Sequence, residues 1–297
     1  IMHHLWILAA LTREMFSSTP MIGICHGTEL RQLYSTTRFS DYVMGGCSKI
    51  DRIAALSPFQ QKVIGDAYGI EEGRITVTGG GFDEDVFYPA KEKLENTVLK
   101  IIYVGKLSFA KGIPDLIQAI SMLPVDKNSI ELLIVGSGND ADVEAIEALV
   151  KKCPFKVVLM GNVSQKHLGE ILRECHIFVL PSFYEGLSLV TIEALASGLR
   201  VVANDLPGMR EWIGRELEES GIIEYVEMPK LINADTPIKN ELPDYHRRLM
   251  EGVLKQITVI QQGATCPHSC NQYVDKFTWN AVFDNIENIY NELITDR

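Results

Sequence analysis

Short apolar runs rich in β-branched residues alternate with longer amphipathic stretches along most of this 297-residue chain. The first pattern is typical of strands buried on both faces, and the second of helices with one apolar face. Their alternation indicates parallel sheets built from strand–helix–strand units. The predicted strands are Met21–Cys25, Ile53–Leu56, Ile75–Thr78, Lys100–Val104, Glu131–Val135, Lys156–Met160, Ile177–Leu180 and Arg200–Ala203. The predicted helices are Phe59–Tyr68, Ile113–Met122, Asp140–Lys151, Gln165–Glu174, Leu189–Ala196 and a long closing helix over Asn271–Leu293.

A polar, proline-containing segment between Pro89 and Thr97 divides this pattern into two regions. Residues 1–94 are interpreted as a partial Rossmann-like domain, because about three strands precede the boundary and sheets usually have about four to six. Residues 95–270 are interpreted as a complete Rossmann-like domain, and residues 271–297 as a C-terminal helix that packs back towards the first domain. The predicted fold class is α/β, with two Rossmann-like doubly wound domains of which the N-terminal one is incomplete.

Composition excludes several classes of protein. Hydrophobic residues make up 46% of the chain and charged residues 23%, which is typical of a globular protein. The net charge of −11 and the lack of a basic run argue against nucleic acid as a partner. The apolar stretch Leu5–Leu11 is too short to cross a bilayer and is interpreted as core, so no transmembrane segment is predicted.

The six cysteines stand mostly in apolar contexts, which favours reduced, buried thiols and a cytoplasmic location over a disulfide framework. Cys266, His268 and Cys270 have the spacing of a partial metal site. No second pair of ligands lies near them in the sequence, so a zinc site is not predicted.

Two carboxylates flank a turn that opens an apolar helix. Glu185 stands where a strand hands over to the helix, and Glu193 lies eight positions later, about two turns into it. The free backbone N–H groups of the first helical turn can receive an anion, and the second carboxylate can accept hydrogen bonds from a diol such as a ribose. The alternative is an ordinary strand–helix connection with one capping and one surface glutamate.

Two lysines occupy a loop between a strand and a helix. Lys106 and Lys111 lie between Gly105 and Gly112, so both ammonium groups reach the carboxyl edge of a parallel sheet, where open α/β sheets bind ligands. The glycines allow the loop to crowd one small target such as a pyrophosphate. Two solvent-exposed lysines are the alternative interpretation.

Three other loops carry weaker signals. The glycine-rich turn in Leu133–Gly138 lacks the third glycine of a dinucleotide fingerprint. Gly161–Ser164 follows a strand and presents backbone groups to a base, or is a plain strand–helix turn with Ser164 as N-cap. His26 ends a strand and precedes Gly27 at the ligand edge of its sheet, where structural and functional roles both remain open.

Taken in order, these motifs closely resemble those of family 4 retaining glycosyltransferases of the GT-B fold. The resemblance rests on residues 26–28, the two-lysine loop, residues 161–163, the two-glutamate block, Pro207-Gly208 and Phe277–Trp279. It implies that a nucleotide-activated sugar lies in a cleft between two Rossmann-like domains and is held mostly by the C-terminal one. The implied reaction transfers the sugar to a hydroxyl of a glycan, lipid or small-molecule acceptor.

The resemblance also implies roles for individual residues. Lys106 and Lys111 would neutralise the donor pyrophosphate without a metal or other cofactor, and Glu185 would bind the sugar hydroxyls. Glu193 would bind the ribose, and His26 the transferred sugar. Further donor-binding positions are Gly27, Gly161, Asn162, Val163, Gly186, Leu187, Ser188 and Leu189. Retention is ascribed in this family to front-face attack, in which the leaving phosphate helps to deprotonate the acceptor.

The chain departs from the family pattern in three ways. Lys106 stands where the family most often has arginine, which keeps the charge but loses the bidentate fork. The segment Gly79–Asp83 lacks the family's frequent asparagine. The family also usually has a longer segment before the position at which this chain starts, so exposed strand edges and self-association are expected.

Two other functions remain open at this level. The chain could be a donor-binding module without turnover, which needs the residues of a more complete N-terminal half. It could also be another GT-B enzyme, such as a sugar-nucleotide epimerase or a phosphorylase, although the two-glutamate block does not fit either of these.

Overall fold

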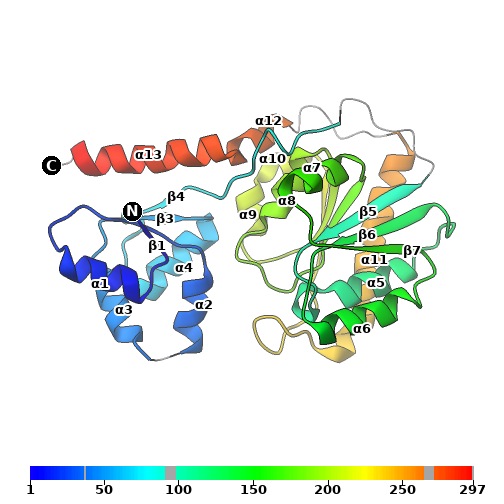
Figure 1. Ribbon diagram of the computed structural model, residues 1–297, viewed down its shortest axis with the longest axis horizontal. Coiled ribbons are helices and arrows are strands. Elements are labelled where there is room, and N and C mark those ends of the chain that lie inside the picture. Colours follow the sequence, from blue (N-terminus) through cyan, green and yellow to red (C-terminus); the bar gives the residue numbers. More distant parts are fainter. Residues whose placement is uncertain (37, 91–97, 264–270, 296–297) are drawn as a thin grey trace. The chain divides into compact units, whose positions relative to one another are not determined.

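The structure is a computed structural model that describes residues 1–36, 38–90, 98–263 and 271–295 (Figure 1). The chain divides into two units. The first comprises Ile1–Gly81, Pro207–Ile213 and Lys276–Arg297, and the second comprises Phe82–Leu206 and Gly214–Asp275. Each unit contains a parallel sheet covered by helices. The α/β class predicted from the alternating pattern is therefore confirmed.

The first unit contains a four-stranded parallel sheet in the order β1-β2-β3-β4. Its strands follow one another in space as they do in the sequence, so the strand order does not reverse. The sequence predicted β2 to β4 but missed β1, which is too short to give an apolar run. Among the described residues, β1 pairs with β2 alone and its other edge is open. The strands are β1 (Met2–His3), β2 (Ile22–Ile24), β3 (Arg52–Ala55) and β4 (Ile75–Val77).

Helices cover both faces of this sheet (Figure 1). Strand residues alternate between two cores. Ile53 belongs to a core with residues of the three helices on one face, whereas Ile22 and Ala54 pack against Ile289 of α13 on the other. The helices on the first face are α1 (Ile7–Met15), α3 (Ser40–Cys47) and α4 (Pro58–Tyr68), and α13 is Trp279–Thr295. The other helices of the unit are α2 (Thr28–Ser35), η1 (Glu72–Arg74) and α9 (Met209–Ile213).

The long closing helix predicted over Asn271–Leu293 is interrupted. The structure has α12 (Asn271–Val274), a 3₁₀ turn η5 (Asp275–Phe277) and then α13. The hydroxyl of Thr278 accepts a hydrogen bond from the N–H of Ala281 at 3.2 Å, as an N-cap residue does. The apolar spacing continues through the break, which is why it predicted one helix.

The outer face of α1 is apolar as well as its inner face. Leu8, Leu11 and Met15 are 64%, 42% and 68% exposed, whereas Ala9 and Ala10 of the same helix are buried. An exposed apolar stripe of this kind often marks a contact surface.

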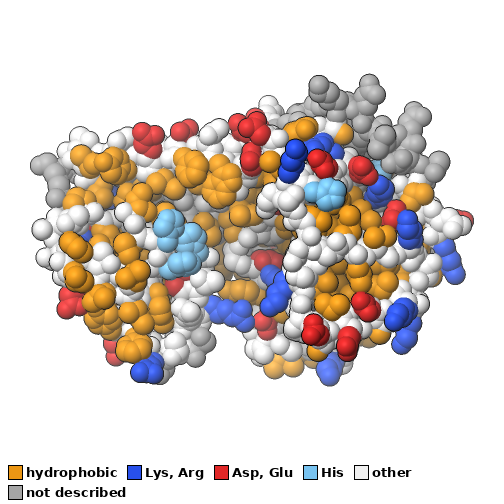
Figure 2. All heavy atoms as spheres, viewed as in Figure 1, with side chains coloured by type: hydrophobic (Ala, Val, Ile, Leu, Met, Phe, Trp, Pro, Cys, Tyr) orange, Lys and Arg blue, Asp and Glu red, His pale blue; other side chains and the backbone are white. Residues whose placement is uncertain are grey.

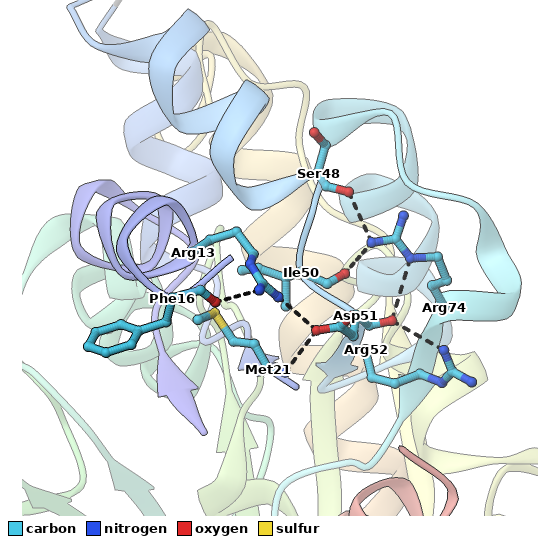
Figure 3. Close-up of polar contacts among 8 residues, drawn as sticks. All are labelled: Arg13, Phe16, Met21, Ser48, Ile50, Asp51, Arg52 and Arg74. Atoms are coloured by element: carbon cyan, nitrogen blue, oxygen red, sulfur yellow. Dashed lines mark hydrogen bonds and ion pairs between the residues drawn. The ribbon is translucent and has the colours of Figure 1, made fainter. Parts of the chain in front are cut away.

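Asp51, just before β3, joins the carboxyl end of α1 to the amino-terminal end of β2 (Figure 3). Its Oδ2 accepts hydrogen bonds from Arg13 Nη1 at 2.8 Å and from the N–H of Met21 at 2.9 Å. Arg13 also donates to the carbonyl of Phe16, and Arg74 donates to backbone carbonyls of the α3–β3 connection. Because Arg13 is only 5% exposed, its charge depends on these partners more than on water.

The second unit contains a six-stranded parallel sheet in the order β10-β9-β8-β5-β6-β7. The first strand in sequence, β5, lies between β6 and β8, so the strand order reverses between β5 and β8. Open α/β sheets bind their ligands at such a switch point, outside the carboxyl ends of the strands. The strands are β5 (Leu99–Val104), β6 (Ile130–Val135), β7 (Lys156–Gly161), β8 (Ile177–Leu180), β9 (Arg200–Asn204) and β10 (Ile223–Val226).

Helices cover both faces of the second sheet (Figure 1). One core lies between the strands and α5, α6 and α11, while α7 and α8 cover the opposite face. Among the described residues, no helix is both long and apolar enough to cross a membrane. The helices are η2 (Phe109–Lys111), α5 (Ile113–Ser121), α6 (Asp140–Val150), α7 (Gln165–Arg173), α8 (Leu189–Ala196), α10 (Arg215–Glu219), η3 (Lys239–Glu241) and α11 (Leu242–Gln261).

We expect Asp51→Ala to lower the free energy of unfolding of the first unit by about 2 to 3 kcal/mol, because it leaves the buried guanidinium of Arg13 without its carboxylate. Thermal and urea unfolding measure this loss. Glu14→Gln is the matched control, since Glu14 lies next to Arg13 on α1 and, within the described part of the chain, accepts an exposed hydrogen bond from Tyr42. Equal changes in the two variants would contradict the role given to Asp51.

Candidate functional site

Backbone hydrogen bonds join three loops at the carboxyl edge of the second sheet. Beyond β5, the N–H of Leu107 donates to the carbonyl of Ser137 at 2.8 Å. Beyond β6, the N–H of Gly136 donates to the carbonyl of Gly161 at 2.8 Å. The loops after β5, β6 and β7 therefore continue side by side past the ends of their strands.

Gly136 makes this contact possible. A Cβ atom at this position would lie 1.9 Å from the carbonyl oxygen of Gly105, and its φ of 133° is one that other residues rarely adopt. The glycine-rich turn that the sequence marked as a weak phosphate loop thus lets the β6 loop approach the β5 loop closely.

A pocket of about 540 Å³ opens beside these loops. Its volume is in the range of small-molecule sites. It brings together three of the predicted residues, Lys106, Asn162 and Val163. The sequence missed Gln165 and Leu168 of α7, which carry no signal beyond ordinary helix spacing. The remaining lining residues are Val104, Gly105, Val135, Gly136, Ser137 and Gly138.

The second predicted lysine lies at the switch point rather than among the pocket residues. Lys111 Nζ is 2.8 Å from Glu185 Oε2 and donates to the carbonyl of Tyr184 at 3.4 Å. The side chains of Lys111 and Glu185 are 27% and 19% exposed, so the charges are partly shielded from water. The two chemical groups predicted separately on the β5 and β8 loops are thereby in direct contact.

The backbone around Lys111 docks on the loop after β8. A Cβ atom at Gly112, where φ is 67°, would lie 2.1 Å from the carbonyl oxygen of Pro181. The N–H of Phe183 donates to the carbonyl of Ala110 at 3.1 Å. These contacts fix the distance between the lysine-bearing loop and the glutamate-bearing loop.

The buried side chain of Asn204 holds the loop after β8 by hydrogen bonds to its backbone. Its Nδ2 donates to the carbonyls of Pro181 and Ser182 at 2.9 and 3.0 Å, and its Oδ1 accepts from Tyr245 Oη at 2.9 Å. Asn204 and Tyr245 are fully buried. The sequence analysis missed both residues. The sequence does show that Asn204 is a polar residue at the end of a predicted strand, next to Asp205. It gives no indication of Tyr245, which lies on a helix far away in the sequence.

Glu193 lies on α8 and is 8% exposed. Burial raises the pKa of its carboxyl group to about 7. In the turn before it, Thr191 Oγ1 donates to Ser188 Oγ at 2.9 Å and the N–H of Leu189 donates to the carbonyl of Leu187 at 3.1 Å. Some hydrogen-bonding groups in the first turn of α8 are therefore already bonded to other groups of the same turn. The carboxyl group of Glu193, one turn later, changes its charge near neutral pH.

His26 and Gly27 lie in the first unit and are not among the residues that line the pocket. His26 follows β2, and Gly27, with a φ of 92°, precedes α2. Burial, followed by the neighbouring His4, lowers the pKa of His26. In the part of the chain that the structure describes, no group of three or more His, Cys, Asp or Glu residues could hold a metal ion. Residues 266–270, the partial metal motif, lie outside that part.

Comparison with known proteins identifies relatives of this chain. The family model described as Glycosyl transferases group 1 matches residues 86–234, which is 149 of the 297 residues. The chain is 27% identical over 222 residues to the glycogen synthase of Mycobacterium tuberculosis, covering 70% of this chain and 52% of the relative. It is 24% identical over 263 residues to the alpha-maltose-1-phosphate synthase of Mycolicibacterium smegmatis, covering 81% and 62%.

A solved structure of HepE from Anabaena, in complex with UDP and glucose, matches with a TM-score of 0.73. The match covers 96% of this chain and 74% of that one, at 16% sequence identity. At this identity the likeness shows the fold alone. The chain spans about half the length of the glycogen synthase and about three fifths of the alpha-maltose-1-phosphate synthase.

We expect Asn204→Ala to lower the free energy of unfolding of the second unit by about 2 to 4 kcal/mol, because three buried hydrogen-bonding groups lose their partner. Chemical unfolding measures this loss. Ser182→Ala is the matched control in the same loop, since the buried hydroxyl of Ser182 finds no hydrogen-bond partner among the described residues. A control that is as destabilised as Asn204→Ala would contradict the role of the amide.

Glu193 predicts a pH-dependent stability. The pKa of Glu193 is raised from 4.5 to about 7 in the folded protein. As the pH rises, this carboxyl group therefore ionises in the unfolded chain before it does in the folded protein. The free energy of unfolding falls by up to about 3 kcal/mol between these two pH values. We therefore expect Glu193→Gln to be more stable than the parent at pH 8 by about this amount and equally stable at pH 4.5. Unfolding experiments at both pH values test it. A variant less stable than the parent at pH 8, or an equal gain in the exposed control Glu144→Gln, would contradict the prediction.

Proposed function

We propose, from the premise that this chain belongs to the glycosyl transferases group 1 family, that it binds a nucleotide diphosphate sugar and transfers the sugar, with retention, to a hydroxyl acceptor. The observation that carries the proposal is the ion pair between Lys111 and Glu185 at the switch point of the second sheet, at the same carboxyl edge as a pocket lined by Lys106. Cations and a carboxylate at this edge suit a ligand with phosphates at one end and hydroxyls at the other.

Donor binding would exchange the partners of the ion pair. In the free protein Glu185 neutralises Lys111. A pyrophosphate would take over the ammonium group of Lys111, and the ammonium group of Lys106 would bind it from the side of the pocket. Glu185 would then accept hydrogen bonds from the sugar hydroxyls. Neither charge is left without a partner before or after binding, which avoids the cost of an isolated, partly buried charge.

The nucleoside end of the donor fits the other predicted residues. The carboxylate of Glu193 would accept hydrogen bonds from the ribose diol, which favours its ionised form and opposes the effect of burial. The base would lie beside Asn162 and Val163 at the pocket wall. The backbone at residues 186–189 would face the phosphates, with the positive end of the α8 dipole behind it.

The two lysines would act most strongly in the transition state. As the bond from the sugar C1 to the phosphate oxygen breaks, negative charge gathers on the leaving nucleoside diphosphate, and preorganised cations stabilise it. The acceptor oxygen bonds to C1 on the same face, and its proton passes to the leaving phosphate. We assign no metal to this step, because Lys106 and Lys111 would supply the positive charge.

The acceptor would be a glycan, a lipid or a small molecule with a free hydroxyl. The two curated relatives are named for making a glycan and a sugar phosphate, so both kinds of product occur among similar proteins. Donor consumption with a panel of UDP-, ADP- and GDP-sugars, with and without acceptor, tests the function. Binding without any turnover would instead make this chain a donor-binding module.

We also propose that the first unit associates with a second copy. The open edge of β1 and the exposed apolar stripe of α1 suit such a contact. We expect the mass measured by sedimentation to rise with concentration, and Leu8→Lys together with Met15→Lys to suppress the rise. Matched lysine substitutions at the exposed positions Glu144 and Glu147 of α6 are the control. A monomer at all concentrations would contradict the proposal.

We expect Lys106→Ala and Lys111→Ala each to weaken binding of the preferred nucleoside diphosphate by about 1.5 to 3 kcal/mol, because each removes a charge-assisted contact to phosphate. Calorimetry with UDP, ADP and GDP measures this loss. Lys156→Ala is the matched control, since Lys156 is 69% exposed and pairs with Glu131 on β6.

Glu185→Gln completes this series. This substitution removes the carboxylate that pairs with Lys111, so we expect the affinity for a nucleoside diphosphate to stay the same or rise. A nucleotide sugar should then bind no more tightly than the nucleoside diphosphate, because the sugar hydroxyls lose their carboxylate partner. Equal affinities of the parent and both lysine variants would contradict the phosphate roles. A loss of nucleoside diphosphate affinity in Glu185→Gln would contradict the exchange of partners.

A further inference from the structure

Three histidines form a cluster in the first unit, at the carboxyl ends of β1 and β2. His3 Nδ1 lies 2.9 Å from His26 Nε2, and their rings stack with centroids 5.2 Å apart. The ring of His4 also lies close to His26, and the two ring centroids are 4.7 Å apart. Figure 2 shows pale-blue histidine side chains gathered in one patch on the surface. Parallel pairing of β1 with β2 places these positions at the ligand edge of the sheet.

Buried groups hold the cluster in place. Glu29, which is 1% exposed, accepts hydrogen bonds from the N–H groups of Leu5 and His26 through Oε1, and its Oε2 lies 3.5 Å from His4 Nδ1. His4 itself has a φ of 65°, a left-handed conformation that residues other than glycine rarely adopt. Backbone conformations of this kind occur preferentially at ligand sites, where the surrounding structure enforces them.

The contact between the His3 and His26 rings restricts where a proton can lie. The contact between His3 and His26 needs one proton between two ring nitrogens, so protonating both rings would set two N–H groups against each other. Burial, and then the proximity of His4, lowers the pKa of His26. Glu29 is the neighbouring carboxylate. Burial raises its pKa, but backbone hydrogen bonds outweigh burial and lower it, so it stays ionised while those bonds occupy it.

Two thiols near Glu29 add no charge. Burial raises the pKa of Cys25, and it raises the pKa of Cys47 to about 12, so both thiols are neutral. The cluster therefore brings together three imidazoles and one carboxylate, Glu29, whose Oε1 already accepts two backbone hydrogen bonds. An anion that accepted hydrogen bonds from the rings would supply the missing negative charge and draw protons onto them.

We propose that His3, His4 and His26 bind a phosphate monoester on the acceptor and take up protons as it binds. A phosphate monoester offers three terminal oxygens, one for each ring, and keeps most of its double charge above about pH 6. The N-terminus of the eight-residue helix α2, with Gly27 as its N-cap, faces the same edge and has no side-chain cap. The identification of this ligand as the acceptor rests on the proposed function, which gives the donor phosphates to the second unit.

Histidine-selective NMR of the whole chain tests the site. The imidazole signals are titrated between about pH 6 and 8.5, with EDTA and saturating UDP, in the presence of glucose 6-phosphate, inorganic phosphate or glucose. We expect glucose 6-phosphate to raise the apparent pKa of the cluster by about one unit, which makes its affinity about tenfold higher at the acid end of this range. His167, exposed on α7 and paired with Glu170, is the internal control and should not respond.

Each other outcome overturns a stated part of the proposal. An equal response of His167, an equal effect of glucose, or an effect that EDTA removes would overturn the anion site. A response to inorganic phosphate that glucose 6-phosphate does not share would overturn the assignment to a phosphorylated acceptor. Loss of UDP binding with the histidine response intact would overturn the proposed donor site and leave the anion site standing.

Variants separate binding from folding. We expect His3→Gln, which keeps a hydrogen-bonding side chain but cannot take up a proton, to abolish the pH dependence of glucose 6-phosphate binding. UDP affinity should stay within about twofold of the parent, as should all values for the control His167→Gln. A His3→Gln variant that binds glucose 6-phosphate with the pH dependence of the parent would overturn the proposal.

Discussion

Close packing of backbone on backbone at Gly112 and Gly136 is the constraint on which the candidate donor site depends. A Cβ atom at either position would lie about 2 Å from a carbonyl oxygen of the neighbouring loop, a distance that no side chain can accept. These contacts let the loops after β5, β6 and β8 converge at the point where the strand order reverses. The rigid sheet therefore fixes where the ammonium and carboxylate groups stand, and Asn204 fixes the glutamate-bearing loop from beneath.

One acidic group of the candidate site is held at a cost to folding, and the other occupies a lysine. Glu193 is buried in a place that raises its pKa to about 7, and Glu185 neutralises the lysine that a pyrophosphate would need. Burial of Glu193 is unfavourable for the free protein near neutral pH, whereas the ion pair leaves neither Glu185 nor Lys111 without a partner. A donor would supply hydroxyls to both carboxylates and phosphates to Lys111. Such local conflicts are expected at functional sites, where a ligand completes the set of interactions.

The sequence predicted most strands because buried parallel strands give continuous apolar runs. It placed Lys106 and Asn162, which line the pocket, at the carboxyl edge of the sheet because each follows such a run. It missed β1, which has only two residues, and β10 (Ile223–Val226), whose short run is interrupted by Glu224. It joined α12 to α13 because apolar spacing continues across the cap at Thr278. The amide of Asn204 and the hydroxyl of Tyr245 meet only through the tertiary fold. The contact between Lys111 and Glu185 likewise depends on the strand order, which places β8 beside β5.

A crystal structure of this chain with its tightest-binding nucleoside diphosphate tests the central claim most directly. The account predicts phosphate oxygens about 3 Å from the ammonium groups of Lys106 and Lys111, with the ribose hydroxyls at the same spacing from Glu193. It also predicts that the ion pair between Lys111 and Glu185 is broken in the complex. A nucleotide bound elsewhere on the second unit, with that ion pair intact and the pocket beside Lys106 empty, would contradict it.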